Sequence, residues 1–325
     1  MTIWLNTPIQ MQFRVIDGLT VRFAQSENRD DHALLLSPWP ESLLAFEPVW
    51  TRLAEHTHLV AIDLPGFGHS QRDDALLSPR AMGEFVLRAA DAFGLARPHV
   101  IGPDIGTAAS LFAAAAQPGR LRSLVVGSGS AAVPLQLGGP SKDWVEAPDL
   151  DSFRGADPQQ IVTSALSGIE RYALPDAIRE DYLSSYEGDR FVESMRYVRA
   201  YPAQLPALGE MLPQIQTPVQ IIAGRHDTAE EDMQTVPCTE GASAPPAGTR
   251  AVGLAARLGT SQPPRTSGQR WRAFALLAHE EVGLVVSDPE QVILESDSYR
   301  RLAYTLRATA VPYRGRPCCL GGGVR

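Results

Sequence analysis

The sequence has 325 residues, of which 44% are hydrophobic and 20% are charged, and its formal net charge is −8. This length suits one large domain or a domain with an insertion. The acidic balance argues against a nucleic-acid partner, and the absence of an apolar run of about 18 residues excludes an obvious membrane span.

Strand-like and helix-like segments alternate over the first part of the chain. A hairpin is predicted over residues 13–26, with Asp17-Gly18 at its turn. Apolar runs typical of buried strands follow at 32–38, 58–62, 99–104 and 121–129. Helical spacing is found at 46–57, 78–95 and 105–120. This alternation predicts a mostly parallel sheet with helices on both faces.

The alternation stops at about residue 133, and the sequence divides into three parts. We expect residues 1–132 to form the first part of a core and residues 133–213, which lack a clear buried strand, to form an inserted helical cap. Residues 214–325 would complete the core, starting with the strand-like "TPVQIIAGRHD". Within this last part, the Pro-, Gly- and Ala-rich stretch 233–270 is expected to be irregular, and 313–325 a frayed tail.

The stretch "VIGPDIG" places Asp104 where a predicted strand meets a predicted helix. Glycines on both sides, Gly102 and Gly106, permit the tight turn that presents a nucleophile. The alternative is that Asp104 only caps the helix. A carboxylate nucleophile suits a carbon with a leaving group or a strained ring, because attack gives an ester that activated water then hydrolyses. A serine would instead suit acyl transfer.

Five segments in order, "LLLSPWPES", "AIDLPGFGHS", "VIGPDIG", "ESMRYVRAYP" and "TPVQIIAGRHD", resemble the α/β-hydrolase superfamily. Within it, the chain is similar to the aspartate-nucleophile branch of epoxide hydrolases and haloalkane dehalogenases, over about residues 12–227. The resemblance implies the α/β-hydrolase fold: a mostly parallel sheet flanked by helices, an inserted helical cap, and here an irregular C-terminal part.

The resemblance also implies roles for individual residues. Asp104 would be the nucleophile, and the backbone N–H groups of Trp39 and Ile105 would be the oxyanion donors. Asp227 would orient the catalytic base, His279, which is the single histidine after Asp227. The alternative is that the irregular C-terminal part does not deliver His279 to the site, in which case the ester would form but not turn over.

The identity of the electrophile follows from exclusion and from the tyrosines of the cap. Haloalkane dehalogenases typically hold the halide with a tryptophan just after the nucleophile and often with an asparagine before the proline that follows the third strand. Here these two places hold Ile105 and Trp39, which favours an epoxide. By resemblance, cap tyrosines would donate a hydrogen bond to the epoxide oxygen. Val198 stands where the family has such a tyrosine, so the role is open among its neighbours. The candidates are Tyr172, Tyr186, Tyr197 and Tyr201.

Three functions therefore stay open: an epoxide hydrolase, a haloalkane dehalogenase, and a catalytically impaired or non-catalytic protein with the same fold. We expect a small hydrophobic substrate, no cofactor and no metal. The three cysteines, Cys238, Cys318 and Cys319, make neither a disulfide framework nor a convincing metal set. The N-terminus does not read as a signal peptide, so a cytoplasmic location is expected. A homodimer is compatible with the sequence, which does not determine the oligomeric state.

Overall fold

The computed structural model describes residues 8–131, 139–167 and 172–221, together with the single residues 135, 137 and 169. The stretch predicted to be irregular, 233–270, the predicted tail, 313–325, and two proposed site residues, Asp227 and His279, lie outside the described residues.

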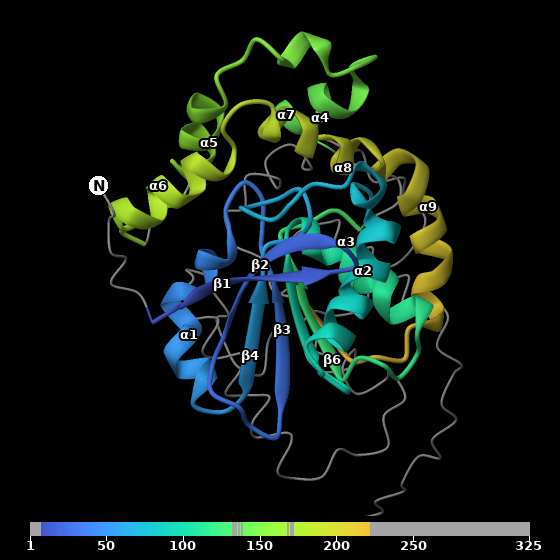
Figure 1. The fold of residues 1–325 in the computed structure, drawn as a ribbon. Coiled ribbons are helices and arrows are strands. Elements are labelled where there is room, and N and C mark those ends of the chain that lie inside the picture. The colour runs from blue at the N-terminus through green and yellow to red at the C-terminus, as the bar shows by residue number, and fades with distance from the viewer. Residues whose placement is uncertain are drawn as a thin grey trace, which may run out of the picture.

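A twisted sheet forms the centre of the described molecule, with the strand order β1-β2-β4-β3-β5-β6-β7 (Figure 1). The first two strands form the expected antiparallel hairpin, and β2 pairs antiparallel with β4. The pairs from β4 through β7 are parallel. The strands are β1 Met11–Ile16, β2 Leu19–Gln25, β3 His32–Leu36, β4 His58–Ile62, β5 His99–Pro103, β6 Ser123–Gly127 and β7 Val219–Ile221.

Helices cover both faces of this sheet, which confirms the predicted α/β architecture. On one face, α2 (Pro79–Ala92), α3 (Ile105–Ala116) and α9 (Tyr201–Met211) contribute to one apolar cluster. On the other, α1 (Glu47–Ala54) contributes to a second cluster. Strand β3 feeds both clusters in alternation, because successive side chains of a strand point to opposite faces. Its neighbours Leu35 and Leu36 are both fully buried, one in each cluster.

Between β6 and β7 the described residues contain helices and no strand. We call this part the helical segment 139–214. Its elements are α4 Gly139–Glu146, η3 Asp151–Phe153, α5 Pro158–Leu166, α6 Asp176–Ser185, α7 Arg190–Ser194, α8 Arg196–Arg199, α9 and η4 Leu212–Gln214. In Figure 1, α4 to α7 extend beyond one end of the sheet. The division of the chain into a core and a cap stays a prediction.

Two further 3-10 turns follow core strands, η1 (Leu43–Phe46) after β3 and η2 (Asp74–Leu76) after β4. None of the helices in the described ranges is long and apolar enough to cross a membrane.

Candidate active site

Asp104 lies on a sharp turn between β5 and α3. Its backbone has φ +49° and ψ −120°, a conformation that is strained for any residue with a side chain. The Asp104 N–H donates to the carbonyl of Gly127 in β6 at 2.8 Å, and Thr107 Oγ1 contacts the carbonyls of Gly102 and Gly127 at 3.1 Å. These contacts hold the strained turn in place against the neighbouring strand.

Glycine is required around this turn because the backbone passes close to its neighbours. A Cβ at Gly102 would lie 2.3 Å from Ser110 Oγ and 2.6 Å from the carbonyl of Gly106. A Cβ at Gly129 would lie 2.1 Å from the carbonyl of Asp104. The first glycine of "GPDIG" is therefore needed for the close approach of α3, whereas the positive φ of the turn lies at Asp104 itself. The second is less crowded, since a Cβ at Gly106 would lie 3.3 Å from the nearest atom.

The Asp104 side chain does not cap the helix. It occupies the N-cap position of α3 but makes no capping hydrogen bond. Instead, Asp104 Oδ2 accepts a hydrogen bond from the backbone N–H of Trp39 at 2.7 Å. Ile105 is fully buried at the first position of α3, where a helix has unpaired backbone N–H groups. Thus Asp104, Trp39 and Ile105, three of the residues singled out in the sequence, come together.

Two of the four candidate tyrosines lie beside this group. Tyr197 in α8 is fully buried, and its hydroxyl donates to the carbonyl of Ile105 at 2.7 Å. Burial, aided by the charge of Asp104, raises the Tyr197 pKa well above its ordinary value. The Tyr186 hydroxyl reaches the carbonyl of Glu41 at 3.4 Å. Burial raises its pKa as well, with a smaller contribution from Asp104. Both phenols therefore stay protonated, and in this arrangement each donates its one O–H to a backbone carbonyl.

The other two tyrosines make different contacts. The Tyr201 ring packs edge-on against Tyr197, with the ring centres 5.8 Å apart. The Tyr172 hydroxyl donates to Glu47 Oε2 at 3.1 Å, at the start of α1. Tyr201 thus supports Tyr197, and Tyr172 joins the helical segment to α1.

Glu41 is a site residue that the sequence analysis missed. It follows Trp39 by two positions, and burial, together with the negative charge of Asp104, raises its pKa to about 7. The sequence feature that could have identified Glu41 is its position two residues after Trp39, the expected oxyanion donor. The site therefore contains a second carboxyl group, Glu41, whose pKa is raised by its surroundings.

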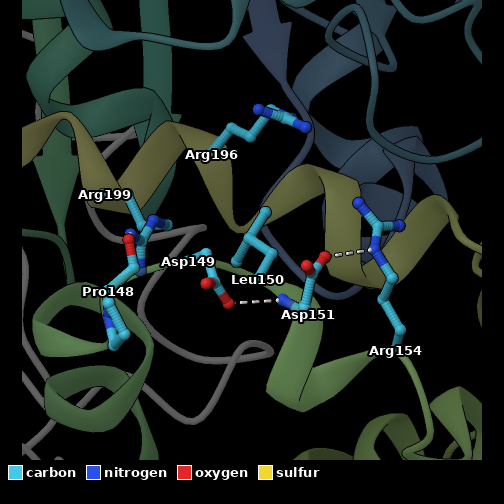
Figure 2. Close-up of a pocket in the computed structure, with 7 residues that line it drawn as sticks. All are labelled: Pro148, Asp149, Leu150, Asp151, Arg154, Arg196 and Arg199. Carbon is cyan, nitrogen blue, oxygen red and sulfur yellow. Dashed lines mark hydrogen bonds and ion pairs between the residues drawn. The ribbon is translucent and has the colours of Figure 1, made fainter.

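A separate pocket of about 300 Å³ lies on the helical segment (Figure 2). It is lined by Pro148, Asp149, Leu150, Asp151, Arg154, Arg196 and Arg199. Its arginines are engaged by protein groups: Arg154 and Arg196 pair with Glu193, and Arg199 donates to the carbonyl of Trp144. None of the residues near Asp104 lines it. Within the described ranges, no cluster of three His, Cys, Asp or Glu side chains is arranged to hold a metal ion.

Residues 34–242 match the family model described as the alpha/beta hydrolase fold. A curated relative is the 2-hydroxy-6-oxononadienedioate/2-hydroxy-6-oxononatrienedioate hydrolase 2 of Pseudomonas putida. It is 28% identical over 200 residues, which cover 59% of this chain and 67% of that protein.

Solved structures with the same fold include Cfl2 from Burkholderia cenocepacia and the epoxide hydrolase VrEH1 from Vigna radiata. Cfl2 has a TM-score of 0.57 and 19% identity, covering 67% of this chain and 80% of its own. VrEH1 has a TM-score of 0.54 and 15% identity, covering 66% of this chain and 79% of its own. At these identities the likeness concerns the fold.

Proposed function

Because the chain belongs to the alpha/beta hydrolase fold family, we propose that it is a hydrolase in which Asp104 attacks a carbon atom of a small hydrophobic epoxide. The observation that carries this proposal is the strained Asp104 turn, whose carboxylate accepts the backbone N–H of Trp39 instead of capping α3. The products are a diol and the free carboxylate.

In the first step, a carboxylate oxygen of Asp104 attacks a ring carbon and forms an ester bond. The ring carbon–oxygen bond breaks, and its electron pair stays on the oxygen. That alkoxide takes a proton from a donor in the helical segment. Tyr186 and Tyr197 are the candidates, because the pKa of each responds to the charge of Asp104.

In the second step, water attacks the carbonyl carbon of the ester. Since Asp104 Oδ2 already accepts the Trp39 N–H, the negative charge that develops on this oxygen would be stabilised without rearrangement. The Ile105 N–H is the second proposed donor. We propose that His279 takes the proton from water and that Asp227 orients His279. The tetrahedral intermediate then collapses, and the departing alkoxide takes the proton from His279 to give the diol. The proton left on the Asp104 carboxyl group passes to the donor that was deprotonated in the first step, which restores both the carboxylate and the donor.

A hydrophobic substrate is supported by the aromatic side chains next to this loop. Trp39 stacks on Phe191 with ring centres 5.2 Å apart and meets Trp144 edge-on at 5.3 Å. Phe191 also packs against Tyr186 at 5.7 Å. This group joins the core to the helical segment and surrounds the residue that donates to Asp104.

One observation favours a haloalkane as the alternative substrate. The indole Nε1 of Trp39 is buried and has no hydrogen-bond partner among the described residues. A buried donor of this kind can bind a departing halide, a task for which Ile105 offers no side-chain donor.

The test is detection of the ester. The wild-type protein is mixed with styrene oxide, quenched in acid and analysed by intact-protein and peptide mass spectrometry. We expect a mass gain of one styrene oxide on Asp104 and phenylethanediol in solution, and neither for Asp104→Ala. Asp17→Ala is a matched control because Asp17 also has positive φ, +52°, but lies in the β1–β2 turn. It should keep the adduct.

Each of the other outcomes would contradict a different part of the proposal. An adduct that persists without diol would show that no base reaches the ester. Bromide release from 1-bromobutane with no reaction of styrene oxide would favour the dehalogenase. Absence of an Asp104 adduct with either compound would refute the proposal.

A further inference from the structure

We propose that Asp181 of α6 is a positioning residue that fixes the loop carrying the Trp39 N–H. We call residues 37–42, between β3 and η1, the oxyanion loop. Its importance for catalysis rests on the function proposed above, whereas the coupling between α6 and this loop does not.

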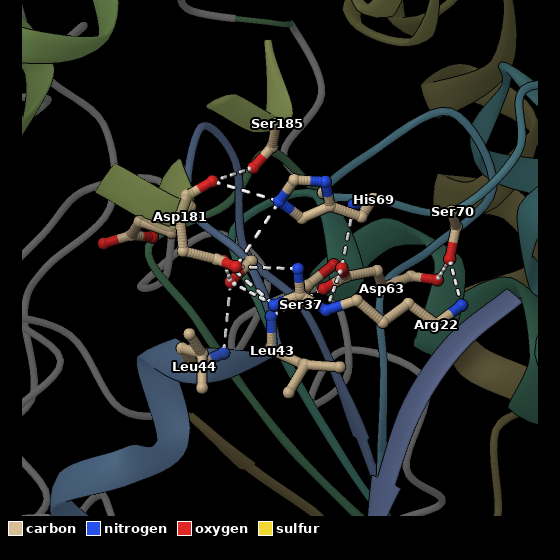
Figure 3. A network of polar contacts seen from close by, with 12 residues as sticks. Arg22, Ser37, Leu43, Leu44, Asp63, His69, Ser70, Asp181 and Ser185 are labelled. Carbon is tan, nitrogen blue, oxygen red and sulfur yellow. Dashed lines mark hydrogen bonds and ion pairs between the residues drawn. The ribbon is translucent and has the colours of Figure 1, made fainter. Parts of the chain in front are cut away.

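Asp181 reaches from the helical segment into the core and makes three strong contacts (Figure 3). Its two carboxylate oxygens accept from Arg22 NH1 and NH2 at 2.8 and 2.9 Å, a bidentate pair across 159 residues of sequence. Oδ2 also accepts from Ser42 Oγ at 2.6 Å. Burial alone would raise the Asp181 pKa, but the hydrogen bonds from His69, Arg22 and Ser42 lower it to about 2.

Ser42 is the last residue of the oxyanion loop and the N-cap of η1. It is fully buried, and its Oγ accepts from the N–H of Leu44 at 3.3 Å. Asp181 therefore holds the hydroxyl that ends the loop and starts the next turn.

A second carboxylate from the core completes the arrangement. Asp63, fully buried after β4, lies 3.3 Å from Arg22 Nε and accepts from the N–H groups of Leu43 and His69 at 2.6 and 2.9 Å. Arg22 thus binds Asp63 and Asp181 at once, and each of these two aspartates contacts a residue at the junction of the oxyanion loop and η1.

The other end of the loop is fixed by the core alone. The Ser37 N–H donates to the carbonyl of Ile62 at 3.0 Å, and Ser37 Oγ accepts from Leu64 N–H at 3.1 Å. Trp39 lies between these two anchors. The position of its N–H relative to Asp104 Oδ2 therefore depends on both Ser37 and Ser42, and of these two anchors Ser42 is the one held by the helical segment. The same segment also contacts the loop through the Tyr186 hydroxyl on the Glu41 carbonyl and through the stacking of Trp39 on Phe191.

A second link between the helical segment and the core offers a matched control. Asp189 and Arg72 NH1 are 3.5 Å apart, and their side chains are 60% and 31% exposed. The Asp181 side chain is only 10% exposed, and that of Arg22 is 4% exposed. Both links join the same two parts of the molecule, but Asp189 has no described contact with the oxyanion loop.

The first experiment measures hydrogen–deuterium exchange of peptides covering residues 37–46 and needs no substrate. We expect Asp181→Asn to increase exchange there several-fold, because loss of the anchor lets the loop open locally. Ser42→Ala, which removes one contact and keeps the Arg22 pair, should do so to a smaller degree. Asp189→Asn should match the wild type. Unchanged exchange in Asp181→Asn would overturn the inference.

The second experiment measures the rate of ester formation on Asp104 with styrene oxide, well below the melting temperature of each variant. We expect at least a tenfold slower rate for Asp181→Asn and a wild-type rate for Asp189→Asn. A wild-type rate for Asp181→Asn would mean that Asp181 has no positioning role in the chemistry. If the wild type itself forms no ester while the exchange difference persists, the proposed function fails and the coupling stands.

Discussion

At the scale of single residues, the site places two carboxyl groups in one environment. Burial disfavours ionisation of Glu41, and the negative charge of Asp104 nearby adds to this effect. Together they raise the Glu41 pKa to about 7. Below this pH Glu41 is mostly neutral.

The raised pKa of Glu41 predicts a dependence of stability on pH. The folded state prefers the protonated form, so this contribution is fully present below about pH 4.5 and is lost as pH rises through about 7. The Glu41→Gln variant has no carboxyl group to ionise at this position. Its free energy of unfolding should therefore increase relative to that of the wild type as the pH rises from about 4.5 to above about 7. We expect a relative gain on the order of 1 to 2 kcal/mol after allowing for partial exposure.

Denaturant unfolding at pH 5 and pH 8 checks this prediction. Glu84→Gln, on the exposed side of α2, is the control and should show the same difference from the wild type at both values. If Glu41→Gln differed from the wild type in stability by the same amount at both pH values, the pKa of Glu41 would not be raised in the folded state.

At the scale of elements, the site depends on how β5, β6 and α3 meet. Strand β5 is an inner strand between β3 and β6, so its end delivers Asp104 to a position enclosed by neighbouring elements. Thr107 in the first turn of α3 contacts the carbonyls that end β5 and β6. The close approach of α3 to β5 leaves no room for a side chain at Gly102.

Gly102→Ala should therefore destabilise the fold. The new Cβ would clash with the backbone carbonyl of Gly106 and with Ser110, and overpacking of this kind costs about 1 to 3 kcal/mol. Gly155→Ala is the control, because a Cβ there meets nothing within 4 Å. Guanidinium unfolding of both variants gives the comparison, and equal stability of the two would show that the turn can relax.

At the scale of the whole molecule, two apolar layers enclose the sheet, and Trp39 packs against both. The oxyanion loop therefore lies where the two layers and the helical segment meet. The Arg22 network joins the same parts through polar contacts. The candidate site thus lies where the two apolar layers and the helical segment meet, and its geometry depends on the relative position of all three.

Because β3 is buried on both faces, we expect similar losses of stability from substitutions at two adjacent leucines of this strand. Leu35→Ala and Leu36→Ala each empty a fully buried site, so each should lower stability by about 2 to 5 kcal/mol. Val15→Ala on β1, where Val15 is 66% exposed, should change stability by less than about 0.5 kcal/mol. Calorimetric melting of the three variants checks this. A small loss for only one leucine would mean that one face of β3 is open to solvent.

The sequence by itself determined the elements and the turn that carries Asp104. The hairpin around Asp17-Gly18, the buried strands and the following helices were predictable, because periodicity and turn chemistry act over a few residues. Finer detail was not predictable in this way: Ser78 occupies the N-cap position of α2, but its side chain makes no capping hydrogen bond.

Only the tertiary structure decided which distant side chains meet at that turn. It brought Tyr186 and Tyr197 near Asp104 and directed Tyr172 to Glu47. It also joined Asp181 to Arg22. A tyrosine in a helix or an aspartate on a helical surface has the same local pattern whether it faces solvent or a buried partner. Its role depends on a contact that folding makes between residues far apart in the chain.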